Sequence, residues 1–184
     1  MSELRGVIEK AYDMAKSGHW DRLMSDWESS DVLANRCSRY SNSDSSWTFL
    51  HQAAYFGNEQ ACRELIRRGA PLDALTRESR TPADVAEQQG YREMGEFLRN
   101  ASIDSELWEP PVDPDVLPSS NRWGEATPAQ AHTQLFVAYG GGVVRIPKST
   151  PYFKDALGRV LVGWHGTFNP PSGMDGGSML SRNS

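Results

Sequence analysis

The sequence has few cysteines, no long apolar run and no dense cluster of basic residues. Its two cysteines among 184 residues, Cys37 and Cys62, lack the Cys/His spacing of a zinc site, and neither a metal site nor a disulfide framework is expected. No stretch approaches the roughly 20 apolar residues of a membrane span, and residues 1–10 do not have the pattern of a secretion signal. These absences predict a soluble, cytoplasmic protein that does not act at a membrane.

Acidic residues outnumber basic ones, 24 to 19, which gives a formal net charge of −5. The acids gather between residues 104 and 125, whereas the basic residues after 132 are scattered. Scattered basic residues make a poor phosphate-binding footprint, because nucleic acids are held by clustered Lys and Arg. The sequence therefore gives no support to a nucleic acid partner.

A pattern of residues recurs in the first hundred positions. The members of the pattern are separated by 33 residues, and the pairs are Thr48 and Thr81, Ala53 and Ala86, Gly57 and Gly90, and Leu65 and Leu98. A third, weaker copy at 11–19 fits residues 50–58 at an offset of 39. The connector near 35–46 therefore carries about six extra residues, and its richness in Ser, Asn and Asp predicts an enlarged loop.

The period of these copies and their short sequence motifs match those of a known repeat. Thr48–His51 stands where the ankyrin repeat family has Thr-Pro-Leu-His, and Leu65–Ala70 stands where it has Leu-Leu-x-x-Gly-Ala. Residues 4–100 therefore resemble the ankyrin repeat family. The resemblance implies about three repeats of paired helices, the first of them degenerate, and a scaffold for binding proteins.

The most reactive side chains of the repeats have plain structural interpretations. His51 stands where the family uses a histidine to hold turns together by hydrogen bonds, which favours a structural role over catalysis. Cys62 falls at a position that the family fills with a buried aliphatic residue, so we expect it in the core. Cys37 falls in or beside the polar connector, where it could be exposed.

The function of such a scaffold depends on its variable positions. These are the residues just before each repeat's Thr and at the end of each first helix, including Lys16 and Ser45, and in the central repeat they hold three aromatic residues. Aromatic and arginine side chains are common in binding hot spots. The predicted partner-binding residues are Trp47, Tyr55, Phe56, Asp44, Arg77, Arg80 and Gln88. Alternatively, the chain's own carboxy-terminal tail covers this face.

The remaining residues predict three further segments. Prolines between 110 and 118 interrupt residues 101–131, which we interpret as an acidic, proline-rich linker carrying Trp108 and Trp123. Residues 132–171 predict a small β-meander, with strands at 134–139, 143–146 and 159–164 and turns at Gly140–Gly142 and Asp155–Gly158. Residues 172–184 predict a disordered tail. The expected fold is mostly α, a short ankyrin-repeat stack over residues 1–100 with a small β-rich carboxy-terminal appendage.

One segment invites a chemical interpretation. His165-Gly166-Thr167 resembles the His-Gly-Thr of ADP-ribosyltransferases, which gives an alternative function in binding NAD or transferring ADP-ribose. That family needs a later tyrosine, and no tyrosine follows Tyr152. Gly140–Gly142 is not followed by the Lys-Ser/Thr of a phosphate-binding loop. The preferred prediction is a non-enzymatic module without cofactor, metal or catalytic residues, which recruits, inhibits or chaperones another protein.

Overall fold

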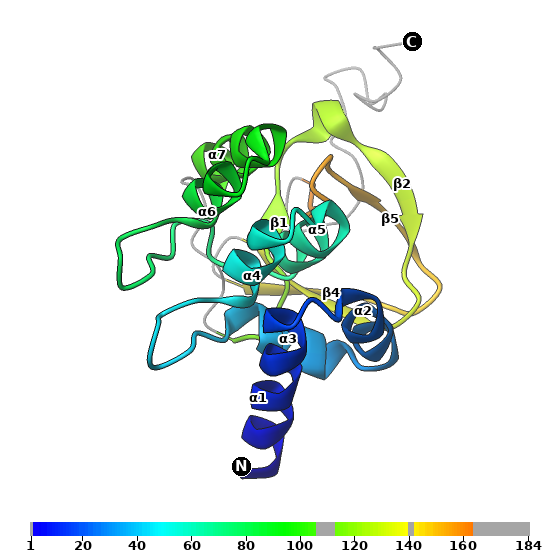
Figure 1. Ribbon diagram of the computed structural model, residues 1–184. Coiled ribbons are helices and arrows are strands. Elements are labelled where there is room, and N and C mark those ends of the chain that lie inside the picture. Colours follow the sequence, from blue (N-terminus) through cyan, green and yellow to red (C-terminus); the bar gives the residue numbers. More distant parts are fainter. Residues whose placement is uncertain (1, 106–112, 140–141, 164–184) are drawn as a thin grey trace. The chain divides into compact units, whose positions relative to one another are not determined.

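The chain divides into two compact units at Pro110 and Pro111, and each is described by itself. The structure, a computed structural model, describes residues 2–105, 113–139 and 142–163 (Figure 1). Within these ranges the first unit holds the α-helices and the second holds the strands. The predicted fold class, mostly helical with a small β-rich appendage, is confirmed.

Seven helices make up the described part of the first unit. They are α1 (Ser2–Lys16), α2 (Trp20–Ser29), α3 (Asp31–Arg39), α4 (Phe49–Tyr55), α5 (Glu59–Arg67), α6 (Pro82–Gln88) and α7 (Arg92–Ser105). Helices α1, α4 and α6 begin three helix pairs, and α4 contacts both α1 and α6. The pairs therefore stack in chain order, as repeats do.

The same turn joins the two helices of every pair. Gly18, Gly57 and Gly90 have positive φ angles of 78°, 63° and 88°, a conformation that favours glycine. After α4, the amide of Gly57 donates to the carbonyl of Ala54 over 3.1 Å, and that of Asn58 to the carbonyl of Ala53 over 3.0 Å. Equivalent bonds close the turns after α1 and α6. The weaker copy at an offset of 39 is thus a helix pair of the same design.

The extra residues between the first and second pairs form a helix, so the prediction of an enlarged loop over 35–46 was wrong for its first part. Helix α3 begins after Ser30, whose hydroxyl accepts a hydrogen bond from the amide of Leu33 over 3.3 Å. Ala34 and Cys37 are fully buried on one face of α3. Cys37 is therefore a core residue and not an exposed thiol, because helical spacing turns it inward together with Ala34.

An aromatic cluster fills the core where α1, α2, α3 and α4 meet. Phe49 is fully buried, and its ring centroid lies 5.4 Å from that of Tyr12, 5.9 Å from that of Trp27 and 5.9 Å from that of Tyr40. Buried aromatic pairs at these distances contribute about 1 kcal/mol each beyond the area that they bury. The cluster therefore fixes the first two helix pairs against each other.

The second unit is built from short strands. They are β1 (Ser119–Ser120), β2 (Thr127–Gln130), β3 (Leu135–Tyr139), β4 (Gly142–Ile146), β5 (Pro151–Lys154) and β6 (Val160–Leu161), with a 3-10 helix at Trp123–Glu125. One sheet has the order β1-β6-β5-β2, in which β1 and β6 are parallel and the other pairs are antiparallel. Strands β3 and β4 form a separate antiparallel pair, with Tyr139 opposite Gly142.

These strands correct two expectations. The segment 101–131, interpreted as a linker, contains the end of α7 and strands β1 and β2. Pro128 is compatible with β2 because β2 lies at the edge of its sheet, where a residue without an amide hydrogen is tolerated. The strands also do not follow one another as a simple meander, because β1 pairs with β6 from the far end of the unit. Trp108, Gly140, Gly141, His165–Thr167 and the predicted tail at 172–184 lie outside the described residues.

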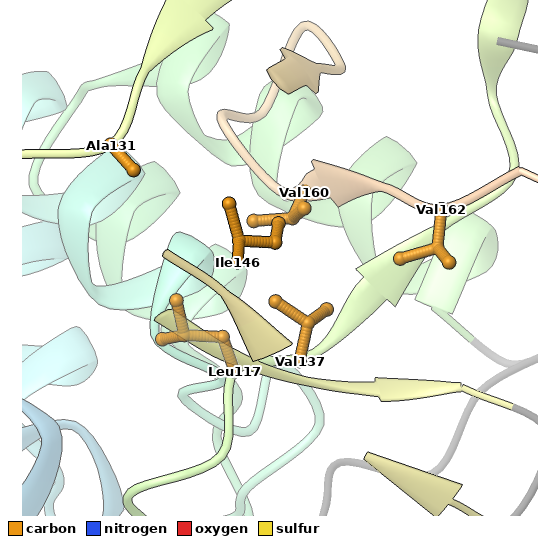
Figure 2. Packing of buried hydrophobic residues seen from close by; sticks show 6 residues of the cluster. All are labelled: Leu117, Ala131, Val137, Ile146, Val160 and Val162. Carbon is orange, nitrogen blue, oxygen red and sulfur yellow. The ribbon is translucent and has the colours of Figure 1, made fainter. Parts of the chain in front are cut away.

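Six buried side chains form the core of the second unit, and Figure 2 shows them converging from different strands and loops. They are Leu117, Ala131, Val137, Ile146, Val160 and Val162. Leu117 also pairs with β3, since its amide donates to the carbonyl of Phe136 over 2.7 Å and its carbonyl accepts from the amide of Ala138 over 2.9 Å. The predicted turn at Asp155–Gly158 is present, and the Asp155 carboxylate accepts bonds from the amides of Leu157 and Arg159.

Candidate functional site

The loops that precede α4 and α6 repeat the same backbone conformation 33 residues apart. Ser46 and Ser79 both have positive φ angles, 59° and 58°. In the first loop, the side-chain oxygen of Asn42 accepts from the amides of Asp44 and Ser45 at 3.0 and 3.1 Å. The two loops therefore place matching residues on the same side of successive repeats: Asp44 and Arg77, Trp47 and Arg80, and Tyr55 and Gln88.

Thr48 and His51 fix the start of α4 and join it to the next repeat. The Thr48 hydroxyl accepts from the amide of His51 over 3.3 Å, while Nδ1 of His51 accepts from the amide of Thr48 over 3.1 Å. Nε2 of His51 lies 3.0 Å from the carbonyl oxygen of Arg80, so this nitrogen carries the proton and donates. Burial lowers the pKa of His51, and the ring is a neutral structural link.

A groove of about 460 Å³ lies beside this link. Its lining comes from α1, the loop before α4, and α4 itself: Tyr12, Lys16, Asn42, Asp44, Ser45, Trp47, Gln52 and Tyr55. The rings of Trp47 and Tyr55 meet edge to face, with centroids 6.1 Å apart and an angle of 62° between their planes. Tyr55 is 40% exposed and Trp47 is half-buried. Both aromatic rings are therefore accessible from the groove.

The base of the groove is rigid. Nε2 of Gln52 donates to the hydroxyl of Tyr12 over 2.9 Å, and both side chains are buried. Tyr12 in turn packs against Phe49 and Tyr40 in the aromatic core. The ring of Trp47 lies 5.7 Å from that of His51, which the preceding bonds hold in place. The groove thus exists before any ligand binds.

Of the predicted partner-binding residues, the structure brings Asp44, Trp47 and Tyr55 into this groove. Phe56 is 37% exposed and its ring lies 5.2 Å from that of Tyr55, but it lines a different hollow, beside Gly18 and Trp20. Phe56 is therefore a neighbour of the groove and not part of its lining.

The other three predicted residues lie along the next repeat. Nη1 of Arg80 donates to Oε1 of Gln88 over 2.5 Å, so these two side chains are held together. Nη2 of Arg77 donates to the carbonyl of Ser43, and its amide donates to the carbonyl of Ser45, each over 3.1 Å. Arg77 thus supports the loop that carries Asp44, although none of the three lines the groove.

Sequence reasoning missed Tyr12, Asn42 and Gln52 as groove residues. Tyr12 is equivalent to His51 at the offset of 39, and this alignment is the signal that would have placed it near Trp47 and Tyr55. Asn42, followed by Ser43 and Asp44, is a typical start of a side-chain-stabilised turn. Gln52 carried no signal, because a polar residue in the middle of a helix is usually exposed.

Residues 25–107 match a family model described as ankyrin repeats, in three copies. Residues 25–107 are therefore ankyrin repeats, as the resemblance in the sequence predicted. The match begins within α2 and so starts later than the expected residue 4, and it extends beyond residue 100 through α7. Ankyrin repeats are protein–protein interaction modules, and the groove between α1 and α4 lies at the first junction between helix pairs of this stack.

Three further observations concern the two thiols, metal binding and membrane insertion. Burial raises the pKa of the thiols of Cys37 and Cys62 to about 12, so both are protonated, packed side chains. Within the described residues, no group of three His, Cys, Asp or Glu side chains is arranged to hold a metal ion. None of the described helices is both long and apolar enough to cross a membrane.

Proposed function

We propose that the ankyrin repeats bind a partner polypeptide in the groove beside α1 and α4, with Trp47 and Tyr55 as the anchoring side chains. The observation that carries the proposal is the pair of accessible aromatic rings above a rigid, hydrogen-bonded base. Tryptophan and tyrosine dominate binding energy when they are desolvated at the centre of an interface. By holding a partner in this way, the protein would recruit, inhibit or chaperone it.

The groove is suited to binding because little has to be ordered when a ligand enters. Trp47 is held against His51, and Tyr55 against both Trp47 and Phe56. Immobilising a flexible side chain at an interface costs about 0.5–1.5 kcal/mol, a cost that preorganised rings largely avoid. The volume of about 460 Å³ accommodates a few side chains of a peptide rather than a folded surface.

The flanking residues extend this surface along the stack. Phe56 lies next to Tyr55 on one side, while Arg80 and Gln88 repeat the positions of Trp47 and Tyr55 in the next repeat. We propose that these residues contact parts of the partner outside the groove. The function is binding without catalysis, since the nearest imidazole, that of His51, is fully buried with both nitrogens hydrogen-bonded.

The test is cross-linking and affinity capture from the native cell, with the full chain as bait. The Trp47→Ala/Tyr55→Ala variant should lose the specific partner, which mass spectrometry identifies in the wild-type capture. The matched control is Tyr91→Ala/Phe136→Ala, which removes two aromatic side chains that are 44% and 40% exposed outside the groove. Both variants should keep the wild-type circular dichroism spectrum. An unchanged capture by the groove variant would overturn the proposal, as would equal losses in the two variants.

A further inference from the structure

We infer that the groove receives the guanidinium group of an arginine in the partner, between the rings of Trp47 and Tyr55 and the carboxylate of Asp44. This inference rests on the proposed function and adds the chemistry of the bound side chain. All three residues line the same groove. An arginine suits them because its planar cation stacks on aromatic rings and its fork of N–H donors matches a carboxylate.

The aromatic walls meet in a corner. The ring planes of Trp47 and Tyr55 are inclined by 62°, with centroids 6.1 Å apart. A planar cation can lie on the face of one ring while its edge approaches the other, within the distance of about 6 Å at which cation–π attraction acts. The imidazole of His51, whose ring centroid lies 5.7 Å from that of Trp47, is fully buried and accepts the amide hydrogen of Thr48 at Nδ1, so it is neutral and does not oppose a positive charge.

Asp44 supplies the negative charge. Its backbone amide is bound to the side chain of Asn42, and Arg77 holds the backbone of the same loop through the carbonyls of Ser43 and Ser45. These bonds fix the loop, and Asp44 is exposed and lines the groove. A carboxylate on a fixed loop can accept two parallel hydrogen bonds from a guanidinium group, the stronger form of such a pair.

The chain's own neighbouring arginines are engaged with other oxygen atoms. Arg77 donates to the carbonyl of Ser43, while Arg80 donates to Gln88 and lies 3.7 Å from a carboxylate oxygen of Glu78. Neither arginine lines the groove. Neither of these two arginines therefore occupies the aromatic corner.

Lys16 favours one orientation of the bound peptide in the groove. Among the described residues that line the groove it is the single basic one, and it lies at the end of α1, whereas Asp44 lies on the loop before α4. With one charge of each sign, the groove does not attract every cation equally. It favours a peptide whose arginine faces Asp44 and whose carboxylate or carbonyl oxygen faces Lys16.

The experiment uses the full chain and defined peptides. A displayed library of random 12-residue peptides is selected on the wild-type protein and counter-selected on Trp47→Ala/Tyr55→Ala, and the recovered peptides are synthesised. Each recovered arginine is then replaced by citrulline, which keeps the size of the side chain and removes its charge. Replacement of the groove-bound arginine should weaken binding, measured by calorimetry, about tenfold.

A double-mutant cycle assigns the effect to Asp44. The Asp44→Asn variant should lose about the same factor for the arginine peptide and almost nothing for its citrulline form. The control, Asp73→Asn, changes an exposed acid that does not line the groove and should bind both peptides as the wild type does.

Different experimental outcomes would overturn the arginine inference and the proposed function. Peptides that need Trp47 and Tyr55 but tolerate citrulline, or bind Asp44→Asn unchanged, overturn the arginine inference and leave the proposed function in place. Selection that yields no peptide dependent on Trp47 and Tyr55 counts against the proposed function itself.

Discussion

Nη1 of Arg68 donates a hydrogen bond to Oδ1 of Asn35 over 2.8 Å, with both side chains buried. The bond joins the end of α5 to α3, the helix added between the first two repeats. The same guanidinium group lies 2.9 Å from the carboxylate of Asp31 and 2.6 Å from that of Glu64. One arginine thus attaches the added helix to the repeat stack.

Removing Arg68 should destabilise the helical unit strongly. In Arg68→Ala, the buried amide of Asn35 loses its partner, and we expect the free energy of unfolding to fall by about 3 kcal/mol, as when one member of a buried polar network is removed. Urea unfolding followed by circular dichroism measures this loss. Arg5→Ala is the control, because Arg5 pairs with Glu9 on an exposed helix face, where a pair contributes less than about 1 kcal/mol. Similar losses in the two variants would show that Arg68 has no special role.

The stability of the helical unit should also depend on pH through Glu64. Burial alone would raise the pKa of this carboxyl, but hydrogen bonds and charge from Arg67, together with Arg68, lower it to about 2. An unfolded glutamate titrates near 4.3. Stabilisation by ionised Glu64 is therefore fully present above that value and is lost as the pH falls toward 2.

The variant that isolates this effect is Glu64→Gln. Between about pH 5 and pH 2, the wild type should lose about 2 kcal/mol more than the variant does. Urea titrations at several pH values measure the difference, with exposed Glu96→Gln as the control that should follow the wild type. Parallel pH profiles for wild type and Glu64→Gln would contradict the prediction.

His51 should make the protein less stable in mildly acidic solution. Its folded-state pKa is lowered by burial, whereas in the unfolded chain it titrates near 6.5. The unfolded state therefore binds a proton first as the pH falls below that value, and stability decreases with it. In His51→Gln this slope should disappear, together with a loss of about 1–2 kcal/mol at neutral pH from the broken bond to Arg80. Replacement of the exposed His19 should change neither quantity, and a persistent slope in His51→Gln would contradict the assignment.

The stability cost of an alanine substitution can be compared between the equivalent turns at Gly57 and Gly90. Alanine at either Gly57 or Gly90 meets the strain of a positive φ angle, about 1 kcal/mol. At Gly57 an added Cβ would also lie 2.7 Å from the ring of Tyr91, while at Gly90 it would meet no atom of the described residues within 4 Å. Gly57→Ala should therefore cost about 1 kcal/mol more than Gly90→Ala in thermal unfolding. In a Tyr91→Ala background the two costs should become equal, and a difference that persists there would refute the steric cause.

The helix pairs were predictable from the sequence because their determinants are local. A threonine cap, small apolar residues at helical spacing and a glycine turn recur together at 33 residues. Helix α3 was not predictable in the same way, since its buried face contains Asn35 and Ser38. These polar side chains are buried only because Arg68 and a backbone carbonyl satisfy them, and such partners are distant in the sequence or invisible to a hydropathy pattern.

In the groove and in the second unit, too, the features that the sequence did not predict depend on residues that are distant in the chain. Trp47 and Tyr55 were predicted from their position within one repeat, whereas Tyr12 reaches the groove from another repeat through the packing of α1 on α4. Strands β1 and β6 are two residues each and pair over a long sequence separation. Strands of two residues are too short to show an alternation of apolar and polar side chains. The prediction of a linker over residues 101–131 therefore depended on its prolines.

The bond between His51 and the carbonyl of Arg80 makes one hydrogen atom a reporter on the junction between two repeats. The Nε2 proton is shielded from solvent and is held by an oxygen of the following repeat. Its nuclear magnetic resonance signal should be separate from those of exposed imidazoles and should exchange slowly with water. The lifetime of that signal then measures how often the second repeat separates from the third, without any label being introduced.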